Sequence, residues 1–396
     1  MKNKISKTKQ CLIAVIVILT ASLIRIATLA VHVDVPRLPN HQNGYYDYEG
    51  DMHWHTEYTR DAFGSYKDLA RFGNQCKLDF LITTEHNNLL PLRDHQEGWH
   101  GRMLTLVGIE STRKEGYLLG VNFYKYTTHD LPTDDFLSEV ARQGGFTLIA
   151  HPKSPRWHWR GDIDDRIVGQ EIIDLTDQFA TASPLSIVTG ALYFPFNKQA
   201  GFIQVYHRPA DALKMWDDLT EKRHFTGVYA PDVHQSIRLW GRHMLRFPRA
   251  EDVLPIAHNH VILRTPFTGD LRQDKALLLD AIKEGRLYVA IDSLQDATGF
   301  FFYARQANKE AWMGEQLPAG MDTTFSVTLP TRLGLKGLVI NVYHNGQLIS
   351  KGAGASHIFQ AKLPGSYRIE VVCEIPTFWG SKRSVTWIYS NPIYLR

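Results

Sequence analysis

The stretch Leu78-Asp79-Phe80-Leu81-Ile82-Thr83-Thr84-Glu85-His86 decides the fold, because an apolar run ends abruptly in polar chemistry. A short apolar run of this kind predicts a buried strand. Residues 104–110 follow the same plan and end in Glu110, and residues 146–151 end in His151. Segments of helical period at 65–72, 133–142 and 210–222 accompany these runs. Strands that alternate with helices predict a parallel α/β architecture.

Working outward toward the C-terminus, the pattern changes after about residue 306. Short alternating runs at 323–329, 337–343, 365–372 and 384–389 predict strands, and Asn345-Gly346 between two of them is a strong hairpin signal. We therefore expect an α/β domain over residues 44–306 and a small antiparallel β-sandwich over residues 307–396.

The N-terminus has the layout of an export signal. Lysines at positions 2, 4, 7 and 9 precede an apolar run over 12–24, and after Arg25 apolar residues continue to Val31. This pattern predicts that residues 1–31 are a signal peptide, with Ala30 at a cleavage site, or a retained membrane anchor. Residues 32–43, rich in Pro, His and Asn, are expected to be a linker. We expect an exported protein, periplasmic or extracellular, that contacts the membrane through this segment if it is uncleaved.

The net charge argues against a nucleic-acid partner, and the histidines are concentrated in one part of the chain. The net charge of +3 is too mild to favour a nucleic-acid partner. Of the 18 histidines, 11 lie between His53 and His234. Two pairs stand out there, His53-Trp54-His55 and Asp232-Val233-His234. Alternate residues of a strand share a face, so each pair is expected to present both side chains to one point.

Histidines and carboxylates that converge at strand ends are the donor set of a transition-metal site. Barrels built from alternating strands and helices gather such side chains at the C-terminal ends of their strands. Imidazole and carboxylate ligands hold zinc, manganese or iron, and metals with open positions activate water. Each pair alone is weak, but together they predict metal-assisted hydrolysis.

The ordered set His-Trp-His, Thr-Glu-His-Asn, Gly-Ile-Glu, Ala-His-Pro and Asp-Val-His resembles the PHP superfamily, the polymerase and histidinol phosphatase domain. The motifs cover about residues 44–263, and several exported members also carry a C-terminal β-sandwich. The resemblance implies a distorted (β/α)7 barrel with two or three divalent metal ions, zinc, manganese or iron, at the strand ends.

The resemblance also implies a ligand set. The first metal would be held by His53, His55, Glu110 and Asp232. Glu110 would bridge to a second metal at His151. His86 and His234 would hold a third, with Asp61 as the acidic partner. His53, Glu110 and Asp232 are the residues expected to matter most for catalysis, with metal-activated water attacking phosphorus.

Two positions depart from the family pattern. Many relatives have Asp-His where this chain has Glu85-His86, and relatives often place a histidine of the second metal site near Tyr117. The second site is therefore expected to be weak, empty or completed by another residue, such as His129 or Glu171. Glu171 is equally well interpreted as an ordinary strand-edge residue.

The substrate is less defined than the metal site. Lys153 and Arg156 follow His151 and are candidates to bind a phosphate, although a solvated loop explains them equally well. The leading hypothesis is a phosphoesterase acting on a small-molecule phosphate ester. One alternative keeps the metals but cleaves carboxylic or carbamate esters. The other is a non-catalytic exported metal-binding or scaffold protein.

Overall fold

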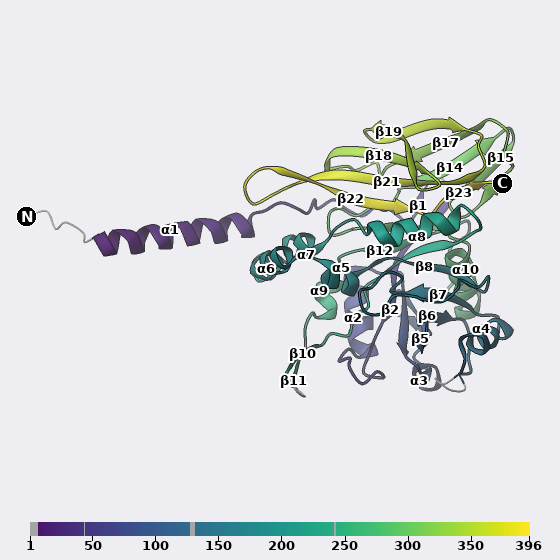
Figure 1. Cartoon of the computed structure of the whole chain (residues 1–396), viewed down its shortest axis with the longest axis horizontal. Coiled ribbons are helices and arrows are strands. Elements are labelled where there is room, and N and C mark those ends of the chain that lie inside the picture. The colour runs from purple at the N-terminus through teal and green to yellow at the C-terminus, as the bar shows by residue number, and fades with distance from the viewer. Residues whose placement is uncertain (1–6, 43, 127–130, 241–242) are drawn as a thin grey trace, which may run out of the picture.

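The structure is a computed structural model that describes residues 7–42, 44–126, 131–240 and 243–396. It is a mixed α/β protein with a large mixed sheet and a separate four-stranded antiparallel sheet (Figure 1). The helices are α1 (Lys7–Ala27), α2 (Tyr66–Cys76), α3 (Leu90–Arg93), α4 (Thr133–Arg142), α5 (Leu175–Thr181), α6 (Pro184–Tyr193), α7 (Lys198–Val205), α8 (Ala210–Thr220), α9 (Ala250–Val253) and α10 (Leu271–Lys283).

The strands of the first part are β1 (His41–Gln42), β2 (Tyr45–Trp54), β3 (Phe80–His86), β4 (Gly98–His100), β5 (Met103–Arg113), β6 (Gly116–Val121), β7 (Phe146–Ala150), β8 (Ile167–Asp174), β9 (Thr226–Ala230), β10 (Ile237–Trp240), β11 (His243–Leu245), β12 (His258–Leu263) and β13 (Leu287–Ala290). The remaining strands are β14 (Phe301–Gln306), β15 (Lys309–Trp312), β16 (Gln316–Leu317), β17 (Thr323–Thr328), β18 (Lys336–His344), β19 (Gln347–Ala353), β20 (Ser356–Ala361), β21 (Gly365–Pro376), β22 (Lys382–Ser390) and β23 (Ile393–Leu395).

The strands that carry the histidine motifs are mostly parallel. β2 pairs with β3, β3 with β5, β7 with β8 and β8 with β9, all in parallel. β6 breaks the expected pattern, because it runs antiparallel to both β5 and β7. Only Lys114 and Glu115 separate β5 from β6, and so short a turn permits only an antiparallel pair. The sheet is therefore mixed, and the prediction of a parallel architecture holds only for part of it.

Helices predicted from periodicity are present. α4 has the predicted bounds, and α2 and α8 differ from prediction by a few residues at their ends. α2 begins where the Ser65 hydroxyl accepts a hydrogen bond from the backbone N–H of Asp68, which satisfies one free donor of the first turn. It ends at Lys77, whose φ of 64° stops the helix in the left-handed region.

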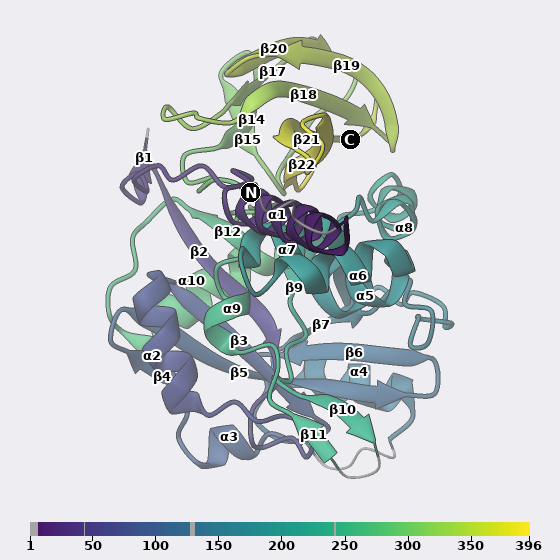
Figure 2. The same ribbon diagram turned by 90° about the vertical axis from the view of Figure 1, so that its left-hand side faces the viewer.

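The C-terminal strands form two layers. β18 and β19 meet at Asn345 and Gly346, with φ values of 47° and 75°, the two left-handed residues that a tight hairpin turn needs. The sheet of β15, β14, β17 and β20 faces β21, where the rings of Phe325 and Tyr367 lie 4.8 Å apart. β22 also pairs with β13, so this region continues the large sheet (Figure 2).

Helix α1 projects from the body (Figure 1). It is 21 residues long, and its most apolar 18-residue window has a mean hydropathy of 2.3, as expected for a signal or anchor segment. The residues that follow α1 pack against the body. Leu29 and Val31 are each 2% exposed, and the Val33 N–H donates to the carbonyl of Leu294 at 2.7 Å. The start of the predicted linker is therefore bound to the body.

Candidate metal centre

The polar residues of the motifs meet at one edge of the large sheet. His53 lies near the end of β2, His86 ends β3, and Glu110 lies toward the end of β5. His151 follows β7 and Asp232 follows β9. These strands are neighbours whose carboxyl ends point the same way, so their terminal side chains are brought together.

His53, His55, Glu110 and Asp232 form the most enclosed group, and all four are buried. The Nε2 atom of His55 lies 3.3 Å from Glu110 Oε2 and 3.2 Å from Asp232 Oδ1. The Nε2 atom of His53 lies 3.5 Å and 3.4 Å from the same two oxygens. Two imidazoles and two carboxylates therefore surround one point.

The facing atoms of this group do not satisfy one another. His53 Nε2, His55 Nε2 and Asp232 Oδ1 are buried without a hydrogen-bond partner among the described residues. A buried polar atom without a partner is costly, and native proteins rarely leave several in one place. A cation between them supplies the missing interaction. Two nitrogens and two carboxylates suit zinc, manganese or iron, so these residues fit a divalent transition metal.

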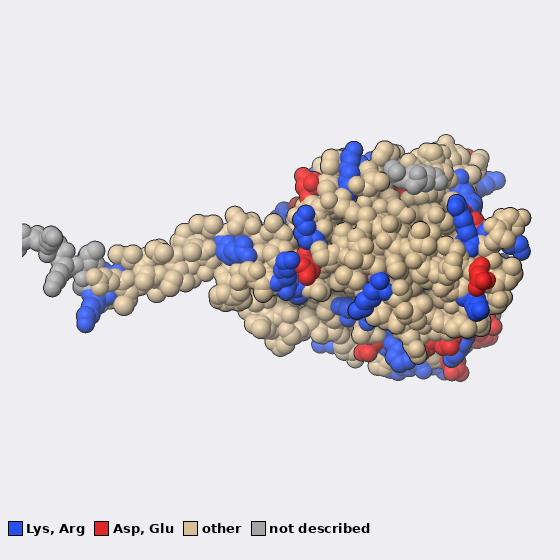
Figure 3. Space-filling view, turned by 90° about the horizontal axis from the view of Figure 1, so that it is seen from above, with Lys and Arg blue, Asp and Glu red and all other residues tan. Residues whose placement is uncertain are grey.

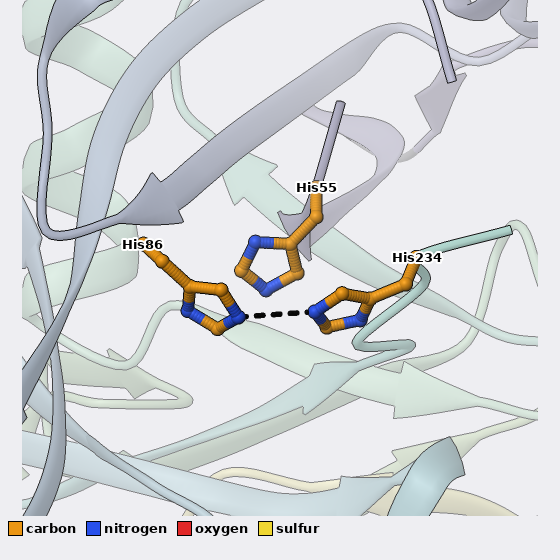
Figure 4. Close-up of side chains that lie close together, drawn as sticks. All are labelled: His55, His86 and His234. Atoms are coloured by element: carbon orange, nitrogen blue, oxygen red, sulfur yellow. Dashed lines mark hydrogen bonds between the residues drawn. The ribbon is translucent and has the colours of Figure 1, made fainter. Parts of the chain in front are cut away.

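A second group contains three histidines, His55, His86 and His234 (Figure 4). The Nε2 atoms of His86 and His234 lie 3.1 Å apart. Asp61 Oδ2 lies 3.8 Å from His86 Nε2 and 3.9 Å from His234 Nε2, so the acidic partner named from sequence is adjacent. Burial and the nearby His55 lower the pKa of His234 to about 4. His234 is therefore neutral at pH 7, the form that binds metals.

The third group surrounds His151. Its Nε2 atom lies 3.4 Å from Glu110 Oε1. Its Nδ1 atom lies 3.6 Å from Asp174 Oδ2 and 3.5 Å from Asp177 Oδ2. Tyr117 lies edge to face against His151, with the two ring centroids 6.0 Å apart. The two aspartates were missed in the sequence. Asp174 ends β8, a position that could have drawn attention, but it is equally typical of an ordinary helix cap.

The negative charge of Asp174 is disfavoured at its buried position when no cation is nearby. Burial raises its pKa well above the usual range, and His151 only partly offsets this. One of its oxygens accepts the N–H of Asp177 at 2.7 Å, as a cap of α5, while the other has no hydrogen-bond partner in the described chain. Asp174 is thus a further candidate ligand beside His151, and the structure groups it with His151 and His53.

Glu171 positions two candidate ligands. Its Oε1 lies 2.6 Å from His53 Nδ1, and its Oε2 accepts the backbone N–H of His151 at 2.7 Å. Because both oxygens already have partners, these contacts favour a positioning role for Glu171 over direct binding of a metal. Carboxylates that grip the far nitrogen of a ligand histidine fix its ring and tautomer. Glu171 therefore orients Nε2 of His53 toward Glu110 and Asp232. His129, the other residue suggested for the second site, lies outside the described residues.

Glu85 also has a structural explanation. Its oxygens accept hydrogen bonds from the Thr56 hydroxyl at 2.6 Å and the Thr59 hydroxyl at 2.7 Å. The loop after His55 is held by these bonds, and the Thr59 hydroxyl in turn accepts the backbone N–H of His86 at 3.1 Å. Glu85 thus organises the loop that carries Asp61, while His86 faces the cluster.

The backbone at three candidate ligands is left-handed. His53, His151 and Asp232 have φ values of 69°, 49° and 45°. The expectation that Asp232 lies in a strand is therefore wrong, while His53 lies in β2 as expected but at an irregular position. The pairing of β2 with β3 shifts register beside His53, and Asp232 lies beyond the end of β9. Residues in this region cost about 1–3 kcal/mol each, and such strain collects at functional sites.

The carboxylates hold protons on the histidines when no metal is bound. Burial lowers the pKa of His55, but Asp232 and Glu110 outweigh it and raise the pKa to about 9. Burial also opposes the charge on His53, yet Glu171 and Glu110 raise its pKa well above the usual range. Protons and metal ions therefore compete for the same nitrogens.

Two cavities adjoin the cluster. The larger, about 630 Å³, reaches Asp61, Asp232 and His234 and has Arg156 at its edge. Its other walls are mostly apolar, formed in part by Trp157, Leu175, Phe179, Ile237, Met244 and Phe247. The smaller, about 210 Å³, is lined by Lys153, Asp174 and Asp177. The two cations named from sequence thus lie on different cavities.

The sequence matches no protein-family model, and no curated protein matches it. A functional assignment therefore depends on the residues of the site themselves.

Proposed function

We propose that the chain is a divalent-metal-dependent hydrolase with a PHP-like barrel, acting on a phosphate ester. The observation that carries the proposal is the set of buried donor atoms without partners at His53, His55 and Asp232 among the described residues. Divalent metal ions held by these residues supply Lewis acidity and lower the pKa of water, as ester hydrolysis at neutral pH requires.

The protein's own groups have separable roles in this proposal. His53, His55, Glu110 and Asp232 would hold the first ion, and Glu110 also reaches His151 through its other oxygen. Glu171 keeps the ring of His53 in place. Arg156, on the cavity that reaches Asp232 and His234, is suited to bind an anionic ester oxygen.

The substrate proposed is an ester with an apolar group, because the cavity beside His234 has mostly apolar walls. That same cavity supports a second candidate function, hydrolysis of carboxylic or carbamate esters at the same metals. Arg156 favours the phosphate ester, since it provides a cation for a substrate charge that neutral esters lack.

The test combines metal analysis with a substrate panel. Purified full-length protein is expected to contain at least one tightly bound transition metal per chain. It is expected to cleave aryl or alkyl phosphate mono- or diesters faster than matched carboxylic esters. Arg156→Gln should raise KM for phosphate esters and leave carboxylic esters unaffected. Bound metal without hydrolysis of any ester would favour the non-catalytic alternative, and absence of metal would reject the proposal.

A further inference from the structure

An uncharged segment of the chain covers one end of the body. No charged residue lies between Asp177 and Lys198, a stretch that contains all of α6. On α6, Leu185 is 73% exposed, Val188 56% and Leu192 60%. These residues are spaced three and four apart, so they share one face of the helix. Contiguous exposed apolar residues of this kind mark an interaction surface.

The inner face of α6 is occupied, which leaves the outer one for a partner. Gly190 lies against α7, where an added Cβ would come 2.9 Å from the carbonyl oxygen of Gly201. This contact lets the two helices approach closely. The outward leucines are therefore fixed in place rather than exposed by a loose helix.

A hairpin tip extends the same surface. Between β21 and β22, Trp379 is 89% exposed and Phe378 stacks edge-on against it with centroids 4.9 Å apart. Phe378 also contacts Tyr193 at the end of α6, with centroids 6.3 Å apart. The tip and α6 therefore form one apolar surface from segments about 190 residues apart in sequence.

The end of α1 is fastened to both parts of this surface. Arg25 donates hydrogen bonds to the carbonyls of Phe378 at 3.0 Å and Thr377 at 2.8 Å. Asn197, just before α7, donates to the carbonyl of Leu29 at 3.0 Å. Figures 1 and 2 show α6, α7 and the β21–β22 tip grouped around the point where α1 leaves the body.

We infer that α1 is a retained membrane anchor and that the outer face of α6 together with the Trp379 tip is embedded in the bilayer surface from which α1 emerges. The direction of α1 identifies the occupant, because a membrane crossed by this helix must lie against the end of the body that bears both features. In the view of Figure 3, basic side chains lie at the outer end of the projecting helix and close to the body, and the stretch between them shows no charged side chain. Apolar helices and tryptophans are the elements that proteins place at the bilayer interface.

The packing of residues after α1 supports retention. Cleavage after Ala30 would remove the buried Leu29 from the body. It would also remove Arg25, and the two hydrogen bonds that Arg25 donates to the β21–β22 tip would be lost. A segment that is discarded has no need of such contacts. This inference is independent of the metal chemistry.

The test measures the depth of single nitroxide labels in the full-length chain. Cys11 and Cys76 are replaced by Ser, while the buried Cys373 stays. Labels are placed by Leu185→Cys, Leu192→Cys and Trp379→Cys. The matched control is Ile358→Cys, which is 67% exposed on β20, far from α1 in Figure 2. The protein is reconstituted into vesicles of phosphatidylethanolamine and phosphatidylglycerol.

The three labels are expected to collide severalfold less with a water-soluble nickel complex than the control, and more with oxygen, which concentrates in lipid. Nickel collisions equal to the control at Leu185 and Trp379 would overturn the inference. Protection from both reagents would also overturn it, because protein rather than lipid would cover the surface. N-terminal sequencing of membrane-purified chain must find residues of α1. A chain that begins at or after Val31 rejects the anchor.

Discussion

Strand β2 carries parts of two buried clusters of histidines and carboxylates, and they are built differently. At its C-terminal end, His53 and His55 belong with Glu110 and Asp232 to what we call the metal-candidate cluster. Near its start, Asp47 and Glu49 join His258, His260, Tyr288 and Asp292 in what we call the buried histidine network. Glu49, His258 and His260 lie close enough together to hold a metal. Composition and proximity therefore do not separate the clusters.

Hydrogen bonding does separate them. Both ring nitrogens of His260 have carboxylate partners, Asp47 at 2.9 Å and Asp292 at 3.0 Å. Tyr288 donates its hydroxyl to the second oxygen of Asp47 at 2.7 Å. In the metal-candidate cluster the Nε2 atoms of His53 and His55 have no hydrogen-bond partner in the described residues. Two of its residues, His53 and Asp232, also have a left-handed backbone. The ring nitrogens of the buried histidine network are therefore satisfied within the protein, while those of the other cluster leave positions that an ion would fill.

The largest effect expected is on metal and activity. His53→Ala or Asp232→Ala should abolish hydrolysis and remove bound metal, because each deletes a direct ligand. His260→Ala should keep the metal. Elemental analysis of the purified variants, paired with turnover, checks this. If either of the first two variants keeps full metal and activity, the division between the clusters is wrong.

For the free energy of unfolding, the order of the two clusters should be reversed, with the larger loss in the buried histidine network. In metal-free protein, His260→Ala should lower the free energy of unfolding by about 3–5 kcal/mol, because buried Asp47 loses its histidine partner and buried Asp292 loses one of two. His55→Ala should cost less, since neither of its ring nitrogens has a hydrogen bond to lose among the described residues. Denaturant unfolding of chelator-treated protein measures both. Equal losses would mean that the metal-candidate cluster also supports the fold.

Replacing a residue that positions a ligand should lower the affinity for the metal, although every ligand is still present. Glu171→Gln is expected to lower metal affinity by about 10–100-fold, the usual effect of disturbing a histidine's outer partner. The exposed Glu221→Gln is the control. Competition with a chromophoric chelator gives the affinities. Complete loss of metal would instead place Glu171 among the ligands.

Rising pH should increase the metal affinity of the metal-candidate cluster. It should decrease the contribution of the buried histidine network to the free energy of unfolding. Metal affinity should increase up to about pH 9, because a proton on His55, whose pKa is raised to about 9, competes with the ion. Burial opposes the charge on His258, but Glu49 and Asp292 raise its pKa to about 10. A raised histidine pKa stabilises the fold fully below its unfolded value of 6.5 and loses that contribution as pH rises to about 10.

The pH dependence is measured in two series. Calorimetric metal titrations should show proton release and rising affinity between neutral pH and about pH 9. The difference in unfolding free energy between the natural chain and His258→Gln should shrink over the window from pH 6.5 to about 10. A difference that stays flat over this window would mean that His258 is not charged in the folded protein.

The smallest effect concerns the site at His151. Occupancy there should be lower than at His53, His55, Glu110 and Asp232, and Tyr117→His should raise the total metal content by a fraction of an ion per chain. Anomalous scattering maps give the occupancies. Equal and full occupancy in the natural chain would mean that another residue completes the site at His151. Asp174→Asn would then be the variant that empties this site.

Sequence reasoning located residues whose position relative to a strand end is readable. His86, Glu110 and His151 follow apolar runs, so their meeting could be expected from parallel pairing alone. Asp174 escaped and Glu171 stayed undecided, because a capping aspartate and a strand glutamate look the same whether or not a histidine packs against them. The left-handed backbone at His53 and Asp232 also left no signal, since neither is the glycine that usually marks it.

One contact joins the candidate metal centre to the apolar surface around α6. Phe194, which follows α6, packs against Phe247 on the wall of the larger cavity, with centroids 5.1 Å apart. If α6 lies in the bilayer, the cavity opens beside lipid, and a substrate with an apolar tail can enter from the membrane. Its relevant concentration is then molecules per unit area of bilayer rather than per unit volume. Adding inert lipid at constant total substrate would slow such an enzyme, while diluting the vesicles in buffer would not.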